Sequence, residues 1–218
     1  MLWDWGYAID ILPELLRGLL VTVQATLLGS AVAYALGLVF ALVRRSRIPV
    51  LSQAVWLLVE FVRSTPLLVQ LFFLYFVLPD LGIRFDAFTT GVIGLGLHYA
   101  CYTAEVYRAG IEAVPKGQWE ACTALSLPRS RVWTGVILPQ AVPRVLPALG
   151  NYMISMFKET PLLLAISVLE LVGAAREAGS DTFRYIEPFT LAGIFFLLVS
   201  YPAGVLVRRL ERRVGYAT

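Results

Sequence analysis

The sequence is poor in the side chains that most often carry metal or redox chemistry, with one histidine and two cysteines among 218 residues. Cys101 and Cys122 show no C-x-x-C spacing and have no histidine cluster beside them, which argues against a disulfide or a metal site. A G-x-x-x-x-G-K-S/T phosphate-binding loop is also absent, so the sequence gives no sign of a nucleotide-binding site of that kind. We therefore expect this chain to hold no cofactor itself.

Charged residues are scarce as well, because they make up 15% of the chain whereas 58% of it is hydrophobic. That balance is typical of an integral membrane protein, which makes lipid an expected partner. The net charge of +3 does not indicate nucleic acid, since the basic residues lie at the ends of apolar runs. Asp4, Asp10 and Glu14 precede the first basic residue, Arg17, the reverse of a cleavable signal peptide. We expect the first span to remain in the mature protein.

Five apolar segments are long enough to cross a bilayer core of about 30 Å as helices. They cover residues 19–43, 53–78, 88–109, 146–171 and 188–207. The pattern predicts an all-α, polytopic membrane protein with about five transmembrane helices, built as a single domain from residue 1 to residue 218. The sequence shows no internal repeat.

The distribution of lysine and arginine predicts the orientation, because cytoplasmic loops carry the excess of basic residues. Twelve lie on one side: Arg44, Arg45, Arg47, Arg108, Lys116, Arg129, Arg131, Arg144, Arg208, Arg209, Arg212 and Arg213. Four lie on the other side: Arg17, Arg84, Arg176 and Arg184. We expect the N-terminus outside, and the C-terminus and the long central loop in the cytoplasm.

The first span carries small residues at a strict spacing of four: Ala25, Gly29, Ala33, Gly37 and Ala41. Such a spacing makes one face of a helix nearly smooth, so that a neighbouring helix can approach closely. We interpret the stripe as a packing surface within or between subunits, without a chemical role.

The central loop, about residues 110–145, is polar and punctuated by prolines. Proline suits the first turn of a helix and disrupts its interior. The spacing predicts a short helix from about Pro115 to Leu125, a break near Ser126, and a second helix from about Arg129 that ends near Pro139. Two short helices at an angle would form a knob for another protein.

The segment EACTALSLPRSRVWTGVILPQA, residues 120–141, resembles the EAA loop of permease subunits in binding-protein-dependent ABC importers. Residues 60–73, 98–121 and 146–166 resemble the polar amino acid branch of that family, and the run from FVLPDLGIR to RYIEPFT is similar to ectoine and hydroxyectoine permeases. Two residues depart from the EAA pattern. Cys122 stands in place of the second alanine, and Ser126 replaces a glycine, which tolerates positive φ at no steric cost.

The resemblance implies the fold of a type I ABC importer permease and several partners. These are two ATP-binding cassette subunits, which carry the ATP and Mg²⁺, a second permease copy or a homologous sister, and an extracytoplasmic solute-binding protein. It also implies a multi-pass location in a bacterial-type inner membrane. The residues that would couple to the ATPase are Glu120, Ala121, Cys122, Ala124, Leu125 and Ser126.

Two near-copies of one motif, RSTPLL from Arg63 and KETPLL from Lys158, follow about ten apolar residues into the second and fourth spans. Each proline removes an amide and frees the carbonyl four residues earlier, that of Val62 or Phe157. Broken membrane helices are tolerated where they line protein or a polar cavity, and charges there are costly. The candidate substrate pathway is Glu60, Arg63, Thr65, Pro66, His98, Lys158, Glu159 and Thr160.

Other readings of these residues stay open at this point. Glu60 could simply pair with Arg63 and the Lys158 segment could cap a kink, which would make both structural. A secondary transporter driven by an ion gradient would explain the intramembrane glutamates, although such proteins normally show repeats. An intramembrane enzyme would have to use His98, Cys101 and Glu105. Glu170, Glu177, Asp181 and Glu187 could dock the solute-binding protein.

Overall fold

The structure is a computed structural model that describes residues 3–46 and 48–213. Every regular element in these ranges is helical. In chain order they are α1 (Trp5–Asp10), α2 (Leu12–Arg44), α3 (Pro49–Arg63), α4 (Leu67–Phe72), the π-helix Phe73–Val77, the 3₁₀ helix Leu78–Leu81, α5 (Ala87–Glu112), α6 (Lys116–Ala124), α7 (Arg129–Arg131), the π-helix Val132–Ile137, α8 (Leu138–Glu159), the 3₁₀ helix Thr160–Ile166, α9 (Leu171–Thr182) and α10 (Ile186–Arg213). The expected all-α class is confirmed. Arg47, one of the basic residues used to predict the orientation, lies outside the described ranges.

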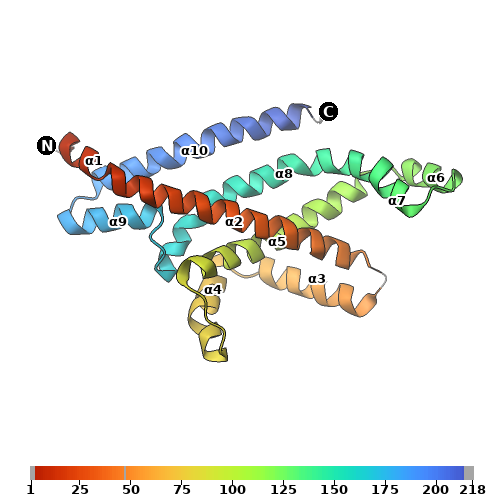
Figure 1. The fold of residues 1–218 in the computed structure, drawn as a ribbon, viewed down its shortest axis with the longest axis horizontal. Coiled ribbons are helices and arrows are strands. Elements are labelled where there is room, and N and C mark those ends of the chain that lie inside the picture. The colour runs from red at the N-terminus through yellow and green to blue at the C-terminus, as the bar shows by residue number, and fades with distance from the viewer. Residues whose placement is uncertain (1–2, 47, 214–218) are drawn as a thin grey trace.

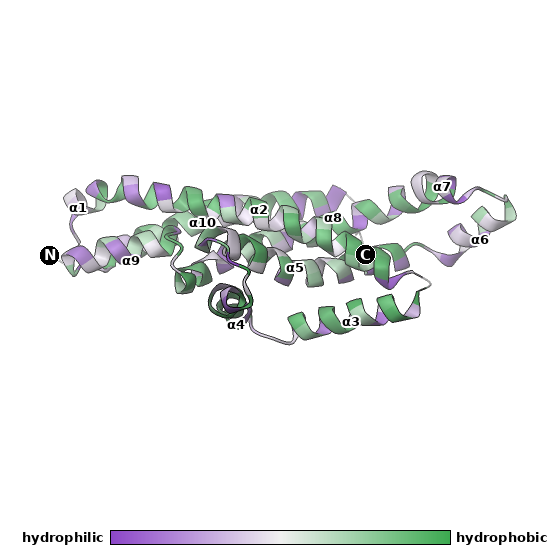
Figure 2. Ribbon diagram, turned by 60° about the horizontal axis from the view of Figure 1, so that its bottom comes forward, coloured by the Kyte–Doolittle hydropathy of each residue, from purple (hydrophilic) through white to green (hydrophobic). Residues whose placement is uncertain are grey.

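The molecule is an elongated bundle whose two ends differ in character. Figure 1 shows α1 and α9 at one end of the long axis, and α6 and α7 projecting beyond the other end. Between them, α2, α5, α8 and α10 run along the axis, and hydrophobic residues predominate on these helices in Figure 2. The proline-rich loop therefore forms a projection at one end of the bundle, as its composition predicts.

Length and composition single out fewer spans than the sequence pattern does. Among the described residues, α2 and α10 are long and apolar enough to cross a membrane, and α3 with the segment Leu67–Leu81 would be a third if the pair counts as one span. α5 and α8 have 26 and 22 residues, which at 1.5 Å per residue exceeds a core of about 30 Å. The count of five and the orientation stay predictions.

The small-residue stripe of α2 packs mainly against α5, as the predicted role in helix contact requires. All five residues of the stripe are buried. A Cβ added to Gly37 would lie 2.0 Å from Thr103 Oγ1 and 2.9 Å from the carbonyl oxygen of Ala100. The Thr103 hydroxyl also donates to the carbonyl of Ala33 at 2.9 Å. The contact thus lies within one chain.

The expected second span is divided into two helices rather than kinked. α3 ends at Arg63, and the following segment turns away by 107°. Pro66 caps the start of α4 with extended backbone angles, which explains the sharp break since a proline and the residue before it disfavour helix. Figure 1 shows α4 standing across the long axis of the bundle.

The second helix of the central loop does not end near Pro139, contrary to the prediction. α7 passes through the π-helix Val132–Ile137 into α8, which begins at Leu138, earlier than the expected span start at residue 146. A wide π turn shifts the hydrogen-bond register, so the missing amide of Pro139 falls within the first turn of α8 and is tolerated. α8 ends at Glu159, within the expected fourth span of residues 146–171, and the 3₁₀ helix continues to Ile166.

Candidate functional site

The two TPLL motifs come together inside the bundle. Leu67, the first leucine after Pro66, and Leu163, the second leucine after Pro161, belong to one buried apolar cluster, together with Leu95, Tyr99 and Met156. The freed carbonyl of Val62 accepts from the Thr65 hydroxyl at 3.2 Å. That of Phe157 accepts from the Thr160 hydroxyl at 2.9 Å. At each break the threonine of the motif therefore provides a hydrogen bond to the carbonyl that the proline frees. The two breaks lie next to each other in the fold.

His98 on α5 is tied to the first break through Gln70 of α4. Its Nδ1 lies 3.0 Å from the Gln70 amide oxygen, which can only accept, so Nδ1 carries the proton. The amide nitrogen of Gln70 donates to the Val62 carbonyl at 2.7 Å and to the Thr65 hydroxyl at 2.8 Å. His98 on α5 is thus hydrogen-bonded to a neighbouring helix, α4.

Aromatic rings from α5 and α8 form a cluster that contacts the second break through Glu159. Tyr99 donates its hydroxyl to Glu159 Oε2 at 2.9 Å. Its ring lies 5.9 Å from Tyr152 and 5.5 Å from His98, while Tyr102 lies 5.7 Å from Tyr152. Four rings and one carboxylate thus meet where α5 faces α8. A site of this kind can hold a cation or an aromatic edge.

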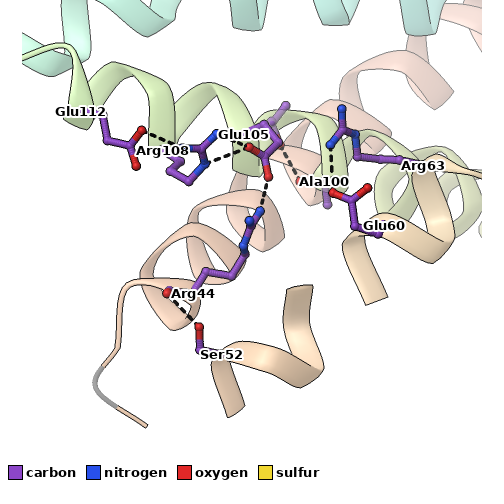
Figure 3. Close-up of polar contacts among 9 residues, drawn as sticks. Arg44, Ser52, Glu60, Arg63, Ala100, Glu105, Arg108 and Glu112 are labelled. Carbon is purple, nitrogen blue, oxygen red and sulfur yellow. Dashed lines mark hydrogen bonds and ion pairs between the residues drawn. The ribbon is translucent and has the colours of Figure 1, made fainter. Parts of the chain in front are cut away.

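The first break adds a cation and a second carboxylate to this cluster. Arg63 pairs with Glu60 at 3.4 Å on the same face of α3, as Figure 3 shows. Its guanidinium also lies 5.4 Å from the centre of the Tyr102 ring. We call the group Glu60, Arg63, Gln70, His98, Tyr99, Tyr102, Tyr152 and Glu159 the polar aromatic cluster.

Two of the predicted pathway residues point elsewhere. Lys158 is exposed and lines a separate pocket with Pro161 of the 3₁₀ helix and residues of α10, such as Phe196. Thr160 is fully buried and engaged with its own backbone. Glu159 and Lys158 lie about 100° apart on an α-helix, so only the glutamate turns toward Tyr99. The exposed Pro66 shapes the break instead of contributing a polar group.

A second charged network lies toward the α6 end and joins α2 to α5. Glu105 accepts from Arg44 of α2, and Arg108 donates to Glu105 at 2.9 Å and to Glu112 at 2.6 Å (Figure 3). Cys101 packs instead with Val59 and Val62 in an apolar cluster. The three residues that an intramembrane enzyme would use therefore face different partners.

The helix α6 of the coupling loop presents two faces of opposite character. Trp119 and Cys122 turn inward, where Trp119 packs on Trp133 with ring centres 5.6 Å apart. Glu120, Ala121 and Ala124 are exposed on the other face, followed by Leu125 with 71% of its surface exposed. Cys122 thus packs α6 against the rest of the loop, and the opposite, outer face of α6 is exposed and can bind a partner.

Ser126 ends α6 in the left-handed backbone conformation that glycine, which the EAA pattern has at this position, adopts without steric cost. Its φ is 50°, in the left-handed region. The amide of Leu127 donates to the carbonyl of Cys122 at 3.1 Å and that of Ser126 to Thr123 at 3.0 Å, the bond pair of a Schellman motif. The turn geometry is kept despite the substitution.

Residues 11–216 match the model of the family described as binding-protein-dependent transport system inner membrane component. The chain belongs to this family. It is 49% identical over 96% of its length to a probable amino-acid ABC transporter permease protein, y4tG, of Sinorhizobium fredii, and the match covers 93% of that protein. It is 33% identical over 98% of its length to the glutamine transport system permease protein GlnP of Escherichia coli, with 99% of that protein covered.

Solved structures give the same result for the fold. The permease superposes with a TM-score of 0.91 on a chain from a structure described as an amino acid ABC transporter with histidines, at 35% identity over 98% of this chain and 100% of that one. A chain of the MetNI methionine ABC transporter shares the fold at a TM-score of 0.76 and 19% identity, over 94% of this chain and 98% of that one. The predicted resemblance to the ABC permease family is confirmed, whereas the ectoine branch stays a prediction.

Sequence reasoning missed half of the polar aromatic cluster of the permease. Gln70, Tyr99, Tyr102 and Tyr152 were not predicted to line the site. Tyr99 directly follows His98 on α5 and Tyr102 lies four residues after it, so the concentration of polar aromatics in that span was the available signal. Of the acidic residues expected to dock a binding protein, Glu170 and Glu187 are buried, and Glu177 and Asp181 are exposed.

Proposed function

We propose that this permease is the transmembrane subunit of an ATP-driven ABC importer for a polar amino acid or a related zwitterionic solute. It would work in a bacterial-type inner membrane with two ATP-binding cassette subunits, a second permease copy or sister, and an extracytoplasmic solute-binding protein. ATP and Mg²⁺ would be held by the cassette subunits. The permease itself would perform no covalent chemistry.

The polar aromatic cluster is the observation that carries the proposal. It places the Arg63 guanidinium and the Glu159 carboxylate on one set of aromatic rings, that of Tyr99, Tyr102 and Tyr152. Charges inside a membrane bundle are costly and usually mark a substrate or ion path. A cation and an anion on a shared aromatic surface suit a solute that carries both a carboxylate and an ammonium group.

The geometry also distinguishes between Arg63 and Lys158, the two basic residues of the predicted pathway, as partners for a solute carboxylate. Arg63 faces Tyr102 within the cluster, whereas Lys158 lies against α10. We therefore assign the carboxylate of the solute to Arg63. The ammonium group, or the cationic ring of a cyclic compatible solute such as ectoine, would bind Glu159 and the tyrosine rings by charge and cation–π attraction.

A conformational cycle follows from this placement. Closure of the paired ATPases would pull the outer face of α6, at the end of the bundle opposite α9 (Figure 1). The bundle would then expose the cluster alternately to the two sides. Coupling of this kind requires that solute and nucleotide each favour one of two states, and not that any residue of the permease reacts.

The experiment that tests the proposal uses the permease reconstituted in liposomes with the ATPase and binding protein that accompany it. We expect ATP hydrolysis to rise when the solute-loaded binding protein is added. Glu159→Gln should reduce the apparent affinity for this stimulation by roughly tenfold to a hundredfold, because a charge-assisted hydrogen bond contributes about 1.5–3 kcal/mol. Lys158→Gln, the adjacent residue outside the cluster, is the matched control and should behave as wild type.

Two results would contradict the proposal. Uptake that is abolished by an ionophore and insensitive to ATP depletion would indicate a secondary transporter. Equal effects of the Glu159 and Lys158 substitutions would remove the solute site from the cluster, while leaving the ATP-driven importer in place.

A further inference from the structure

A basic, aromatic pocket of about 610 Å³ lies where the end of α2 meets the coupling loop. It is separate from the polar aromatic cluster. Its lining comes from the segment after α2, from α6, and from α7 with the following π-helix. The lining residues are Arg45, Ser46, Trp119, Arg129, Val132 and Trp133.

Arg45 is held in place by the two indole rings. Its guanidinium carbon lies 5.2 Å from the centre of the Trp119 ring and 5.5 Å from that of Trp133. The two rings contact each other edge to face. Cation–π contacts fix the direction of the guanidinium but leave its N–H groups able to donate to an anion.

The pocket has positive charge that no carboxylate neutralises within the described ranges. Neither Arg45 nor Arg129 forms an ion pair there, and the lining contains no Asp or Glu. The Ser46 hydroxyl oxygen is buried and has no hydrogen-bond partner in the described part of the chain. A buried polar group without a partner is costly, which indicates that something else completes the site.

A neighbouring cavity shows what a neutralised site looks like. It has a volume of about 420 Å³ and includes Arg44 and Arg108 in its lining. Those two arginines are paired with Glu105 and Glu112. Arg45 lines both cavities, so the positive charge left for a ligand is on the side of Trp119 and Arg129.

The position of the pocket favours a ligand from the membrane surface. α2 has 33 residues, about 50 Å at 1.5 Å per residue, and is longer than a bilayer core of about 30 Å. The apolar run of α2 ends at Val43, and the pocket begins two residues later at Arg45, so we place it next to the expected membrane span, where lipid headgroups are expected. Tryptophan is enriched at that depth, and basic pockets there bind phosphate headgroups.

We infer that this pocket binds the phosphate headgroup of an anionic membrane phospholipid, with Arg45 and Arg129 as the anion ligands and Ser46 as a donor. The lipid is favoured over a carboxylate of the ATPase, because the face of α6 that is free for the ATPase carries Glu120 and Ala121 and points away from Trp119. The lipid would brace the coupling loop against the end of α2. This inference does not depend on the transported solute.

Native mass spectrometry of the full chain in detergent, with its co-purifying partners, tests the site directly. Phosphatidylglycerol and phosphatidylcholine are titrated in parallel, and the retained lipid is counted. We expect a preference for phosphatidylglycerol that falls roughly twenty-fivefold in the double variant Arg45→Gln and Arg129→Gln, since each basic residue at an anionic surface contributes about a factor of five.

The matched control removes two positive charges outside the pocket. Arg131→Gln and Arg209→Gln act on exposed residues of α7 and α10 and should leave the lipid preference unchanged. An equal loss in this control would overturn the inference, because binding would then follow net charge alone. Tryptophan fluorescence and the elution volume of each variant show that it is folded.

Two further arms separate the sources of the anion. Inorganic phosphate at millimolar concentration should not displace phosphatidylglycerol, and full displacement would identify a free anion in place of a lipid. If the double variant keeps its lipid preference but loses its ATPase subunit on purification, the occupant is a protein carboxylate and the inference is wrong.

Discussion

Ser126 offers the sharpest test at the scale of single residues, because it holds a left-handed conformation that glycine adopts without steric cost. Its φ of 50° brings Cβ close to the following carbonyl, at a cost of about 1–2 kcal/mol. Ser126→Gly should therefore stabilise the end of α6 by about 1 kcal/mol. Hydrogen exchange of the Leu127 amide, which closes the turn, measures this as slower exchange.

A β-branched residue at the same position supplies the opposite control. Ser126→Val should speed the exchange of that amide, since branching at Cβ is disfavoured at positive φ. If both variants exchange at the wild-type rate, the turn is not under the strain that its backbone angle indicates.

The residues of the candidate site were only partly predictable from the sequence. Glu60, Arg63 and Glu159 could be identified because a charge within an apolar run needs an explanation. Gln70 and Tyr152 could not, because their roles depend on packing between helices. Gln70 reaches His98 only after the 107° break, and Tyr152 of α8 contacts Tyr99 and Tyr102 of α5. Lys158 was predicted to line the pathway with Glu159. The two side chains point about 100° apart on a helix, and which of them faces the cluster depends on packing that the sequence does not settle.

Gly37 shows the close packing between elements, where α2 meets α5. A methyl group there would lie 2.0 Å from Thr103 Oγ1 and 2.9 Å from a backbone carbonyl oxygen. The hydroxyl can rotate away only by giving up its bond to Ala33, and the backbone cannot move without shifting α5. Gly37→Ala should therefore lower stability by about 1–3 kcal/mol, the usual cost of overpacking. Thermal unfolding in detergent measures the loss.

Gly193 on α10 is the matched control for that substitution. A Cβ added there meets no atom within 4 Å, so Gly193→Ala should be neutral or slightly stabilising, as alanine favours helix. A stable Gly37→Ala variant would mean that α2 and α5 are less closely packed than the structure shows.

At the scale of helices, spacing and proline position predicted most elements but not their connections. The stripe of small residues on α2 and the helix α6 are where the pattern placed them. The continuity of α7 into α8 past Pro139 was missed, because a π turn is set by hydrogen-bond register and leaves no signal in the residue pattern. The angle of α4 was missed for the same kind of reason, as it depends on packing between distant segments.

For the molecule as a whole, transport would depend on mechanical contact at the α6 end. Ala121 is exposed on the outer face of α6, next to Glu120. Ala121→Asp adds a carboxylate to a surface where a partner must come close, which would cost several kcal/mol of binding if the charge stays unpaired. We expect uptake to fall more than tenfold, with the protein still inserted in the membrane, while ATP hydrolysis no longer responds to solute.

Ser130→Asp is the control, because it adds the same charge at an exposed position of α7 outside the outer face of α6. Uptake of labelled solute and ATP hydrolysis are measured together in the same liposomes, so that loss of coupling can be told from loss of either activity. Normal uptake in the Ala121→Asp variant would show that the ATPase does not bind the outer face of α6. A defect of equal size in Ser130→Asp would show that the loop responds to added negative charge in general, and the assignment of the outer face of α6 to the ATPase would then have no support.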